Sequence, residues 1–178
     1  KKNNFMKYSY LLLSFLFASP IKEISEEYLI SQFSTEIKIS MNILKINEKN
    51  KKITQGQAQQ AFYKNELYYW KISQNDTTIA YAFLDNVKGK SMPITFMVIL
   101  SKDGSIINAN VIKYREPYGG EVGNNRWLEQ FNEKNEKSNY DVGKTIDGIT
   151  GATISVNSLS KGIKKIVLLY SQVKDNLE

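Results

Sequence analysis

The middle of the chain consists of hydrophobic-rich runs of strand length separated by short breaks. Four such runs follow one another, at residues 66–73, 77–87, 94–100 and 105–114. Asn75-Asp76 and Lys102-Asp103-Gly104 lie between runs and are typical of tight turns, while Lys88-Gly89-Lys90 ends the second run. Consecutive strands joined by tight turns predict an antiparallel sheet.

Helical spacing of hydrophobic residues appears on both sides of this sheet. It is found in residues 21–33, in a short segment at 125–131, and near the C-terminus at Leu159, Ile163, Ile166, Val167 and Tyr170. Residues 34–60 are mixed, with weak alternation at Ile37-Lys38-Ile39, and allow a strand followed by a helix. We therefore predict one α+β domain over residues 21–178, an antiparallel sheet with flanking helices, with Trp70 and Trp127 packed in its core.

The N-terminus has the layout of a secretory signal peptide. Lysines at positions 1, 2 and 7 precede an apolar run at residues 8–18, and Ser19-Pro20 follows. The run is short for a transmembrane helix, which needs about 20 apolar residues. We expect residues 1–20 to be a signal peptide or an N-terminal anchor, with a helix packed on the domain as the alternative. The domain itself would then be extracytoplasmic, periplasmic or on the cell surface.

The absence of two residue types restricts the chemistry. The chain contains no His and no Cys, which excludes Ser-His-Asp and Cys-His catalysis and makes a transition-metal site unexpected. We predict no catalytic residues and no bound metal, so any redox activity must come from an organic cofactor. The net charge is +6, but the lysines are scattered, and we expect no nucleic-acid binding.

The segment DGITGATIS, residues 147–155, combines a helix start with small residues and hydroxyls. Thr150 is a suitable N-cap, while Gly151 and Ala152 remove side-chain bulk. A helix start of this kind presents free backbone N–H groups and the positive end of the helix dipole, which suit a phosphate. Thr153 and Ser155 place hydroxyls in the first turn. A merely well-capped helix after a loop is the alternative interpretation.

This segment resembles the flavinylation motif of the FMN-binding domain family, which reads Asp, two residues, Ser or Thr, Gly, Ala, Thr. Here the motif runs from Asp147 to Thr153. Residues 66–170 also resemble the family in order and spacing, including its Gly-Lys, Pro-Ile-Thr-Phe and Arg-Glu-Pro…Gly-Gly-Glu elements. The family includes the G-type subunit of the Rnf complex and the C-type subunit of the sodium-translocating NADH:quinone oxidoreductase. The likeness is greater to the small exported FMN-binding proteins. One departure is that Ser155 is followed by Val156 where a second hydroxyl residue is usual.

The resemblance implies a covalent FMN, joined through its phosphate to the hydroxyl of Thr153. A separate Mg-dependent flavin transferase would attach it, with Asp147 helping that enzyme to recognise or position the acceptor. Gly151 and Ala152 would allow the threonine to approach the enzyme. The implied function is electron transfer between redox donor and acceptor proteins at the membrane, rather than stand-alone catalysis. Noncovalent FMN binding and a non-redox exported binding module of the same fold remain as alternatives.

A second candidate segment comprises Glu116, Tyr118, Gly119, Gly120 and Glu121. The glycines permit close backbone approach to a flat ring, and Tyr118 could stack on it. Glu121 could meet the flavin or a partner, and the resemblance places this segment near the flavin. We therefore expect the cofactor at a mouth formed by this loop and the helix start. A plain turn carrying two exposed acids is the alternative.

Overall fold

A five-stranded antiparallel sheet forms the centre of the computed structural model, which describes residues 20–33 and 36–177. The strands are neighbours in chain order: β1 (Lys38–Lys45), β2 (Glu66–Gln74), β3 (Thr77–Lys88), β4 (Pro93–Ser101) and β5 (Ile106–Lys113). All four pairings are antiparallel. The four predicted strands and the α+β class are confirmed, and the weak alternation at residues 37–39 lies at the start of β1, an edge strand that begins at Lys38.

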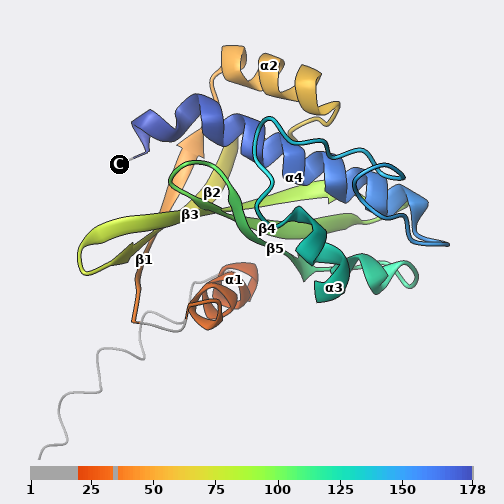
Figure 1. Cartoon of the computed structure of the whole chain (residues 1–178), viewed down its shortest axis with the longest axis horizontal. Coiled ribbons are helices and arrows are strands. Elements are labelled where there is room, and N and C mark those ends of the chain that lie inside the picture. Colours follow the sequence, from red (N-terminus) through yellow and green to blue (C-terminus); the bar gives the residue numbers. More distant parts are fainter. Residues whose placement is uncertain (1–19, 34–35, 178) are drawn as a thin grey trace, which may run out of the picture.

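The helices lie in layers on the two faces of the sheet (Figure 1). One face carries α4 (Thr153–Val173), which is itself covered by α2 (Glu48–Ala58); the opposite face carries α1 (Pro20–Ser31). The short α3 (Asn125–Leu128) lies beside β5 and continues as a 3₁₀ turn, Glu129–Phe131. In the described part of the chain no helix combines the length and hydropathy needed to cross a bilayer. The predicted signal or anchor segment lies outside the described residues, except for Pro20, which begins α1.

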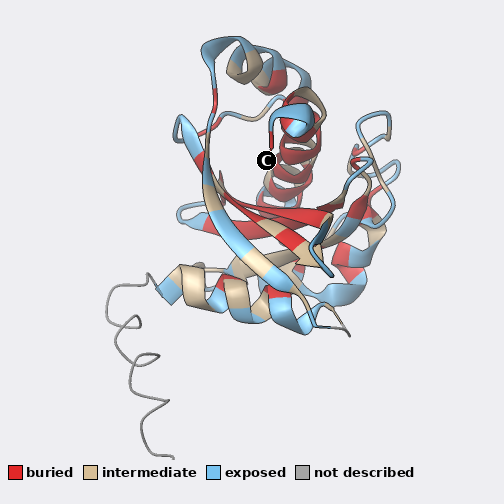
Figure 2. Cartoon of the chain, turned by 90° about the vertical axis from the view of Figure 1, so that its left-hand side faces the viewer, coloured by how far each residue is buried: buried red, intermediate tan, exposed pale blue. Residues whose placement is uncertain are grey.

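Alternating residues of the strands divide the interior into two cores. Phe83 points toward α4, whereas its neighbours Ala82 and Leu84 join the core under α1. Trp70 is fully buried in the α1 core, and Trp127 packs edge-on against Phe131 with ring centroids 5.3 Å apart. Both tryptophans are therefore core residues, as predicted. Figure 2 shows that the burial is concentrated in the central strands and α4, while α2 and β1 are largely exposed.

Helix α4 packs closely against the sheet at Gly162. A Cβ atom at this position would lie 2.4 Å from Val87 Cγ1 and 3.0 Å from Phe96 Cζ. No side chain could be accommodated at those distances without moving the helix or the strand. Glycine thus lets the helix backbone rest directly on β3 and β4.

We expect Gly162→Ala to destabilise the protein by about 1–3 kcal/mol, because the added methyl group overpacks this contact. Gly56→Ala is the matched control in α2, where a Cβ would meet nothing within 4 Å. The control should stabilise by about 0.5–1 kcal/mol, since alanine restricts the unfolded chain and favours helix. Urea unfolding followed by circular dichroism measures both. Equal effects of the two substitutions would contradict the close contact.

A buried ion pair joins α4 to the end of β3. Lys165 Nζ lies 2.8 Å from Asp85 Oδ2, and the two side chains are 0% and 5% exposed. The ammonium also donates to the Ala61 carbonyl at 2.8 Å and lies 4.3 Å from the centre of the Phe62 ring. Burial raises the pKa of Asp85 and lowers the pKa of Lys165, and the attraction between the two charges opposes both shifts. The pair therefore depends on both partners being present.

Lys165→Met should cost about 3–5 kcal/mol at neutral pH, because it leaves the Asp85 carboxylate buried without a counter-charge. Adding Asp85→Asn should recover most of this loss. Without Lys165 the carboxyl pKa in the folded protein rises further above its unfolded value. Stability is therefore regained as pH falls toward about 4 and is lost as pH rises through the folded pKa. Denaturant unfolding of both variants across this pH range measures the effect, and a pH-independent deficit in the single variant would contradict it.

Candidate functional site at the start of helix α4

An open cleft of about 450 Å³ lies where the loop after β5 meets the beginning of α4. Its lining comes from three segments: Lys90 and Ser91 in the β3–β4 connection, residues 116–119 in the loop, and residues 151–155 at the helix start. The two segments predicted from the sequence are therefore brought together. Lys90 and Ser91 were not predicted as site residues, although Lys90 belongs to the Gly-Lys element that the sequence shares with the FMN-binding domain family.

The beginning of α4 differs from the prediction in one respect. Thr150 is not the N-cap: the helix begins at Thr153, Ala152 occupies the cap position, and no side chain caps the first turn. The reason is Gly151, whose left-handed φ of 83° places a turn between Thr150 and the helix. The first backbone N–H groups of the helix are thus left without a side-chain acceptor.

The two hydroxyl groups of the first turn have different surroundings. Thr153 is exposed, and its hydroxyl makes no hydrogen bond to any residue that the structure describes. Its carbonyl accepts a hydrogen bond of 2.8 Å from Asn157 Nδ2. Ser155 is only 4% exposed, and its Oγ lies 3.2 Å from the hydroxyl of Tyr114. Only the Thr153 hydroxyl is therefore both accessible and unengaged.

Tyr114, the residue that follows β5, connects the loop to the helix. Its hydroxyl donates to the Tyr118 carbonyl at 2.6 Å and lies 3.2 Å from Ser155 Oγ. Glu116 Oε2 lies 3.5 Å from the same hydroxyl. Sequence reasoning treated Tyr114 only as the end of a strand, because nothing in the pattern shows which loop atoms its hydroxyl reaches.

Glu116 is partly exposed, and its carboxylate holds the loop to the preceding hairpin. Its Oε1 accepts hydrogen bonds from the backbone N–H groups of Met92, at 2.9 Å, and Ser91. These bonds, Met92 foremost, hold the pKa of Glu116 below its usual value. The carboxylate is thus a structural clamp between the loop and the hairpin.

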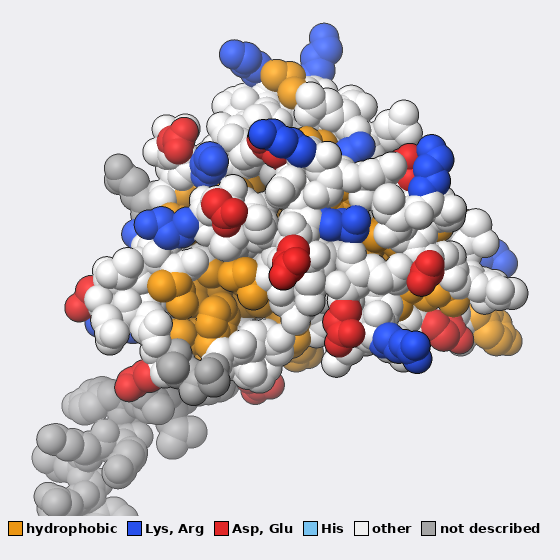
Figure 3. All heavy atoms as spheres, viewed as in Figure 1, with side chains coloured by type: hydrophobic (Ala, Val, Ile, Leu, Met, Phe, Trp, Pro, Cys, Tyr) orange, Lys and Arg blue, Asp and Glu red, His pale blue; other side chains and the backbone are white. Residues whose placement is uncertain are grey.

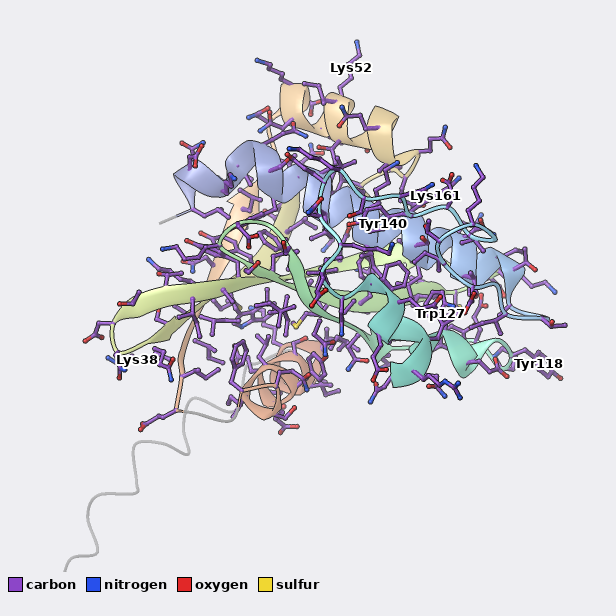
Figure 4. The ribbon with its side chains drawn as sticks, viewed as in Figure 1. Lys38, Lys52, Tyr118, Trp127, Tyr140 and Lys161 are labelled. Carbon is purple, nitrogen blue, oxygen red and sulfur yellow. The ribbon has the colours of Figure 1, made fainter. Side chains whose placement is uncertain are left out.

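The remaining loop residues lie at different places around the cleft. Tyr118 is 83% exposed and projects outward at the end of the molecule where α4 begins (Figure 4). Gly119 has a φ of 79°, and a Cβ there would lie 2.8 Å from the Tyr114 hydroxyl. Gly120 and Glu121 belong to a short 3₁₀ turn, Gly120–Gly123, and neither lines the cleft.

Asp147 lies outside the cleft, and its main chain fixes the segment before the helix. Its N–H donates to Gln130 Oε1 and its carbonyl accepts from Trp127 Nε1, both at 2.8 Å. The side chain is exposed. The ring of Trp127 thus packs in the core, while its indole N–H donates a hydrogen bond to the motif.

The charges around the site do not suggest a metal or a nucleic acid. Across the described residues, no three His, Cys, Asp or Glu side chains are grouped closely enough to hold a metal ion. On the face shown in Figure 3, basic and acidic side chains are interspersed rather than gathered into one basic stripe. The cleft itself combines Lys90, the positive end of α4 and one engaged carboxylate, which suits an anionic group.

Residues 89–167 match the family model of the FMN-binding domain. Over this segment the chain is similar to the FMN-binding domain family. The matched segment begins at the β3–β4 connection and ends within α4, so it includes every residue that lines the cleft. The resemblance seen in the sequence is thereby confirmed, as is FMN as the ligand class of this domain.

Two known proteins are similar to this chain, one in sequence and one in fold. Over 109 residues the chain is 28% identical to the G-type subunit of the proton-translocating ferredoxin:NAD(+) oxidoreductase complex of Clostridium ljungdahlii, covering 56% of this chain and 57% of that relative. The chain thus spans little more than half the length of this relative. The crystal structure of Shewanella oneidensis NqrC matches with a TM-score of 0.58 and 13% identity, covering 88% of this chain and 96% of that one. This second likeness shows the common fold.

We expect Gly119→Ala to loosen the loop, because alanine is strained at this positive φ and its methyl group displaces the Tyr114 hydroxyl. Tyr114→Phe should have the same effect through loss of the hydrogen bond to Tyr118. Amide hydrogen exchange in residues 116–121 should accelerate by roughly five- to thirty-fold, equivalent to about 1–2 kcal/mol of local stability. Gly120→Ala is the control, since its Cβ would meet only the Tyr114 ring, at 3.8 Å. Unchanged exchange in both test variants would show that Tyr114 does not hold the loop.

Proposed function

We propose that this domain carries FMN as a phosphoester on Thr153 Oγ and transfers electrons between redox proteins outside the cytoplasm. The observation that carries the proposal is the position of Thr153. It is the exposed, unengaged hydroxyl at the start of α4, inside the cleft and inside the segment that matches the FMN-binding domain.

The start of α4 fits the phosphate of FMN. The helix has 21 residues, and its first N–H groups have no side-chain cap. A phosphate attached to Thr153 would lie next to these donors and to the positive end of the dipole. Gly151 and Ala152 leave little side-chain bulk around the acceptor. Ser155, held by Tyr114, is close enough in sequence to support the phosphate or the turn itself.

The rest of the cleft fits a flat, partly apolar ring. Tyr118 and Ile154 are exposed large hydrophobic residues, 83% and 51% respectively, and Pro117 lies between Tyr118 and the clamped Glu116. Exposed aromatic and aliphatic side chains at the mouth of a cleft offer stacking surface to an isoalloxazine ring. When bound, FMN supplies reversible one- and two-electron redox chemistry, and the protein's part is to hold and orient it.

A separate enzyme would have to form the phosphoester. The chain has no His or Cys, and the carboxylate of Glu116 is occupied by backbone N–H groups, so the cleft offers no free general base for the Thr153 hydroxyl. We assign attachment to a Mg-dependent flavin transferase. The Thr153 oxygen would gain the bond to phosphorus, and the pyrophosphate bond of FAD would break to release AMP. The exposed side chain of Asp147 is available to that enzyme.

Electron transfer by a tethered cofactor also fits the openness of the cleft. A ring at the mouth would be accessible to protein donors and acceptors without an enclosed substrate pocket. The related clostridial protein belongs to a ferredoxin:NAD(+) oxidoreductase complex, which supports a redox role. Placement outside the cytoplasm rests on the charged and apolar layout of residues 1–20, as a signal peptide or an anchor at residues 8–18.

The attachment site is tested by intact mass after co-expression with a flavin transferase. The unsubstituted protein should gain the mass of FMN less one water, and Thr153→Val should lack it because the acceptor oxygen is gone. Thr150→Val and Ser155→Ala should retain the added mass, since neither removes that oxygen. A modified Thr153→Val protein would move the attachment to another hydroxyl and contradict the assignment.

The same samples distinguish the alternatives. Flavin absorbance that is lost on denaturation, with no added mass, would indicate a noncovalent FMN site. A colourless protein from a host whose transferase modifies a control flavoprotein would indicate a binding module without redox function. Each result would overturn the covalent proposal.

A further inference from the structure

A second hollow lies beyond the flavin cleft, between the end of α2, the segment at residues 140–144 and the outer side of α4. Its volume is about 360 Å³, and most of its lining is polar. Gln57 and Gln59 line it at the end of α2, and Asn157 and Ser160 line it from α4. The FMN-binding cleft shares none of these residues, so the hollow is a separate surface feature.

Three lysines give this hollow a positive charge. Lys144, Lys161 and Lys164 line it, and Asp141 is the one carboxylate among its described lining residues. Lys144 Nζ lies 3.2 Å from Asp141 Oδ2, and its hydrogen bond, together with the positive charges of Lys144 and Lys164, lowers the pKa of Asp141. Neither Lys161 nor Lys164 forms a salt bridge with any carboxylate that the structure describes. The described lining of the hollow therefore carries three lysine charges against the one carboxylate of Asp141.

The lysines share a helix face with the proposed attachment site. One side of α4 carries residues at intervals of four, four and three positions, namely Thr153, Asn157, Lys161 and Lys164. With a rise of 1.5 Å per residue, Lys161 and Lys164 lie about 12 and 16 Å along the helix axis from Thr153. The next turns of α4 are covered by α2, where Gln172 Nε2 donates to Thr54 Oγ1. A partly exposed strip therefore runs from the flavin cleft to the lysines and ends at α2.

The shape of the hollow favours a protein partner over a small anion. None of the three lysines is buried, and their side chains come from separate turns and from the 140–144 segment. Figure 4 shows Lys161 projecting from α4 near the segment that contains Tyr140. Solvent-accessible charges spread over an open hollow accelerate the encounter with an oppositely charged protein more than they hold a small ion tightly.

We propose that the strip formed by Lys144, Asn157, Lys161 and Lys164 is the docking surface for an acidic electron-donor protein, which reduces the flavin at the adjacent end of α4. This inference rests on the proposed function, because it assumes a flavin at Thr153. In each encounter the donor loses one electron and the flavin gains it; the docking surface itself forms no covalent bond and transfers no proton. Charge complementarity sets the rate of encounter, and proximity to the cleft makes the encounter productive.

The test uses the flavin-loaded protein and a plant-type [2Fe–2S] ferredoxin, chosen as a small acidic one-electron donor. Stopped-flow absorbance measures the second-order rate constant for flavin reduction at low and high ionic strength. Lys161→Glu/Lys164→Glu should lower the low-salt rate constant by tenfold or more, on the order of the gain expected from electrostatic steering, and should abolish its decrease with salt. Dithionite, a small anionic reductant that needs no docking surface, should reduce the two double variants at rates within about threefold of each other.

Lys49→Glu/Lys52→Glu is the matched control. It reverses two lysines with the same spacing of three residues, on the exposed side of α2, and changes the net charge equally. Figure 4 shows Lys52 pointing away from α4. The control should lower the rate constant by no more than about threefold, the share expected from net charge alone. An equal loss in both double variants, no loss in the α4 variant, or no salt-dependent reduction of the unsubstituted protein would each overturn the docking surface.

A second measurement does not depend on the flavin. Titration of the flavin-free, ¹⁵N-labelled protein with oxidised ferredoxin should shift the amide resonances of residues 141–144 and 157–164. Shifts spread over the whole surface, or their absence, would overturn the proposal even if electron transfer occurs. If the protein cannot be flavinylated but these shifts are seen, the proposed function fails and the docking surface stands.

Discussion

The direct contact of α4 with the sheet at Gly162 determines where the functional parts of this molecule lie. Because no side chain separates the helix from Val87 and Phe96, the height and direction of α4 over β3 and β4 are restricted. The buried pair of Lys165 and Asp85 joins the helix to the sheet one turn further along. With the middle of the helix held in this way, its first turn extends to the loop after β5. The cleft is therefore a consequence of core packing.

Several side chains around the cleft hold main-chain atoms in place and so leave Thr153 accessible. Tyr114 binds the Tyr118 carbonyl, Glu116 binds two N–H groups of the neighbouring hairpin, and Trp127 binds the Asp147 carbonyl. These bonds fix three loop segments in place. They also engage the polar side chains, which are then not free to act on a ligand. In the proposed function the cleft holds a redox group and has little chemistry of its own, and the outer side of α4 connects it to the proposed docking strip.

Periodicity along the chain was sufficient to predict the strands, the long helix and its buried face. The reason is that alternation and helical spacing record which side of each element is removed from water, and every predicted apolar position of α4 is buried. Local propensity was less reliable. Thr150 is a suitable cap by residue type, but the left-handed Gly151 moves it away from the helix. Glu116 reads as an exposed acid, yet two backbone N–H groups from a distant hairpin engage it.

The sequence by itself determined the α+β class, the order of the elements, the motif from Asp147 to Thr153 and the chemistry that a chain without His and Cys cannot perform. These properties depend on residue type and on spacing over a few turns, which the chain carries locally. Only the tertiary structure decided that Tyr114 joins loop to helix, that Ser155 is buried while Thr153 is open, and that Lys144 lies with Lys161 and Lys164. Such relations join residues that are distant in sequence. They arise from the packing of α4 on the sheet, which no local pattern specifies.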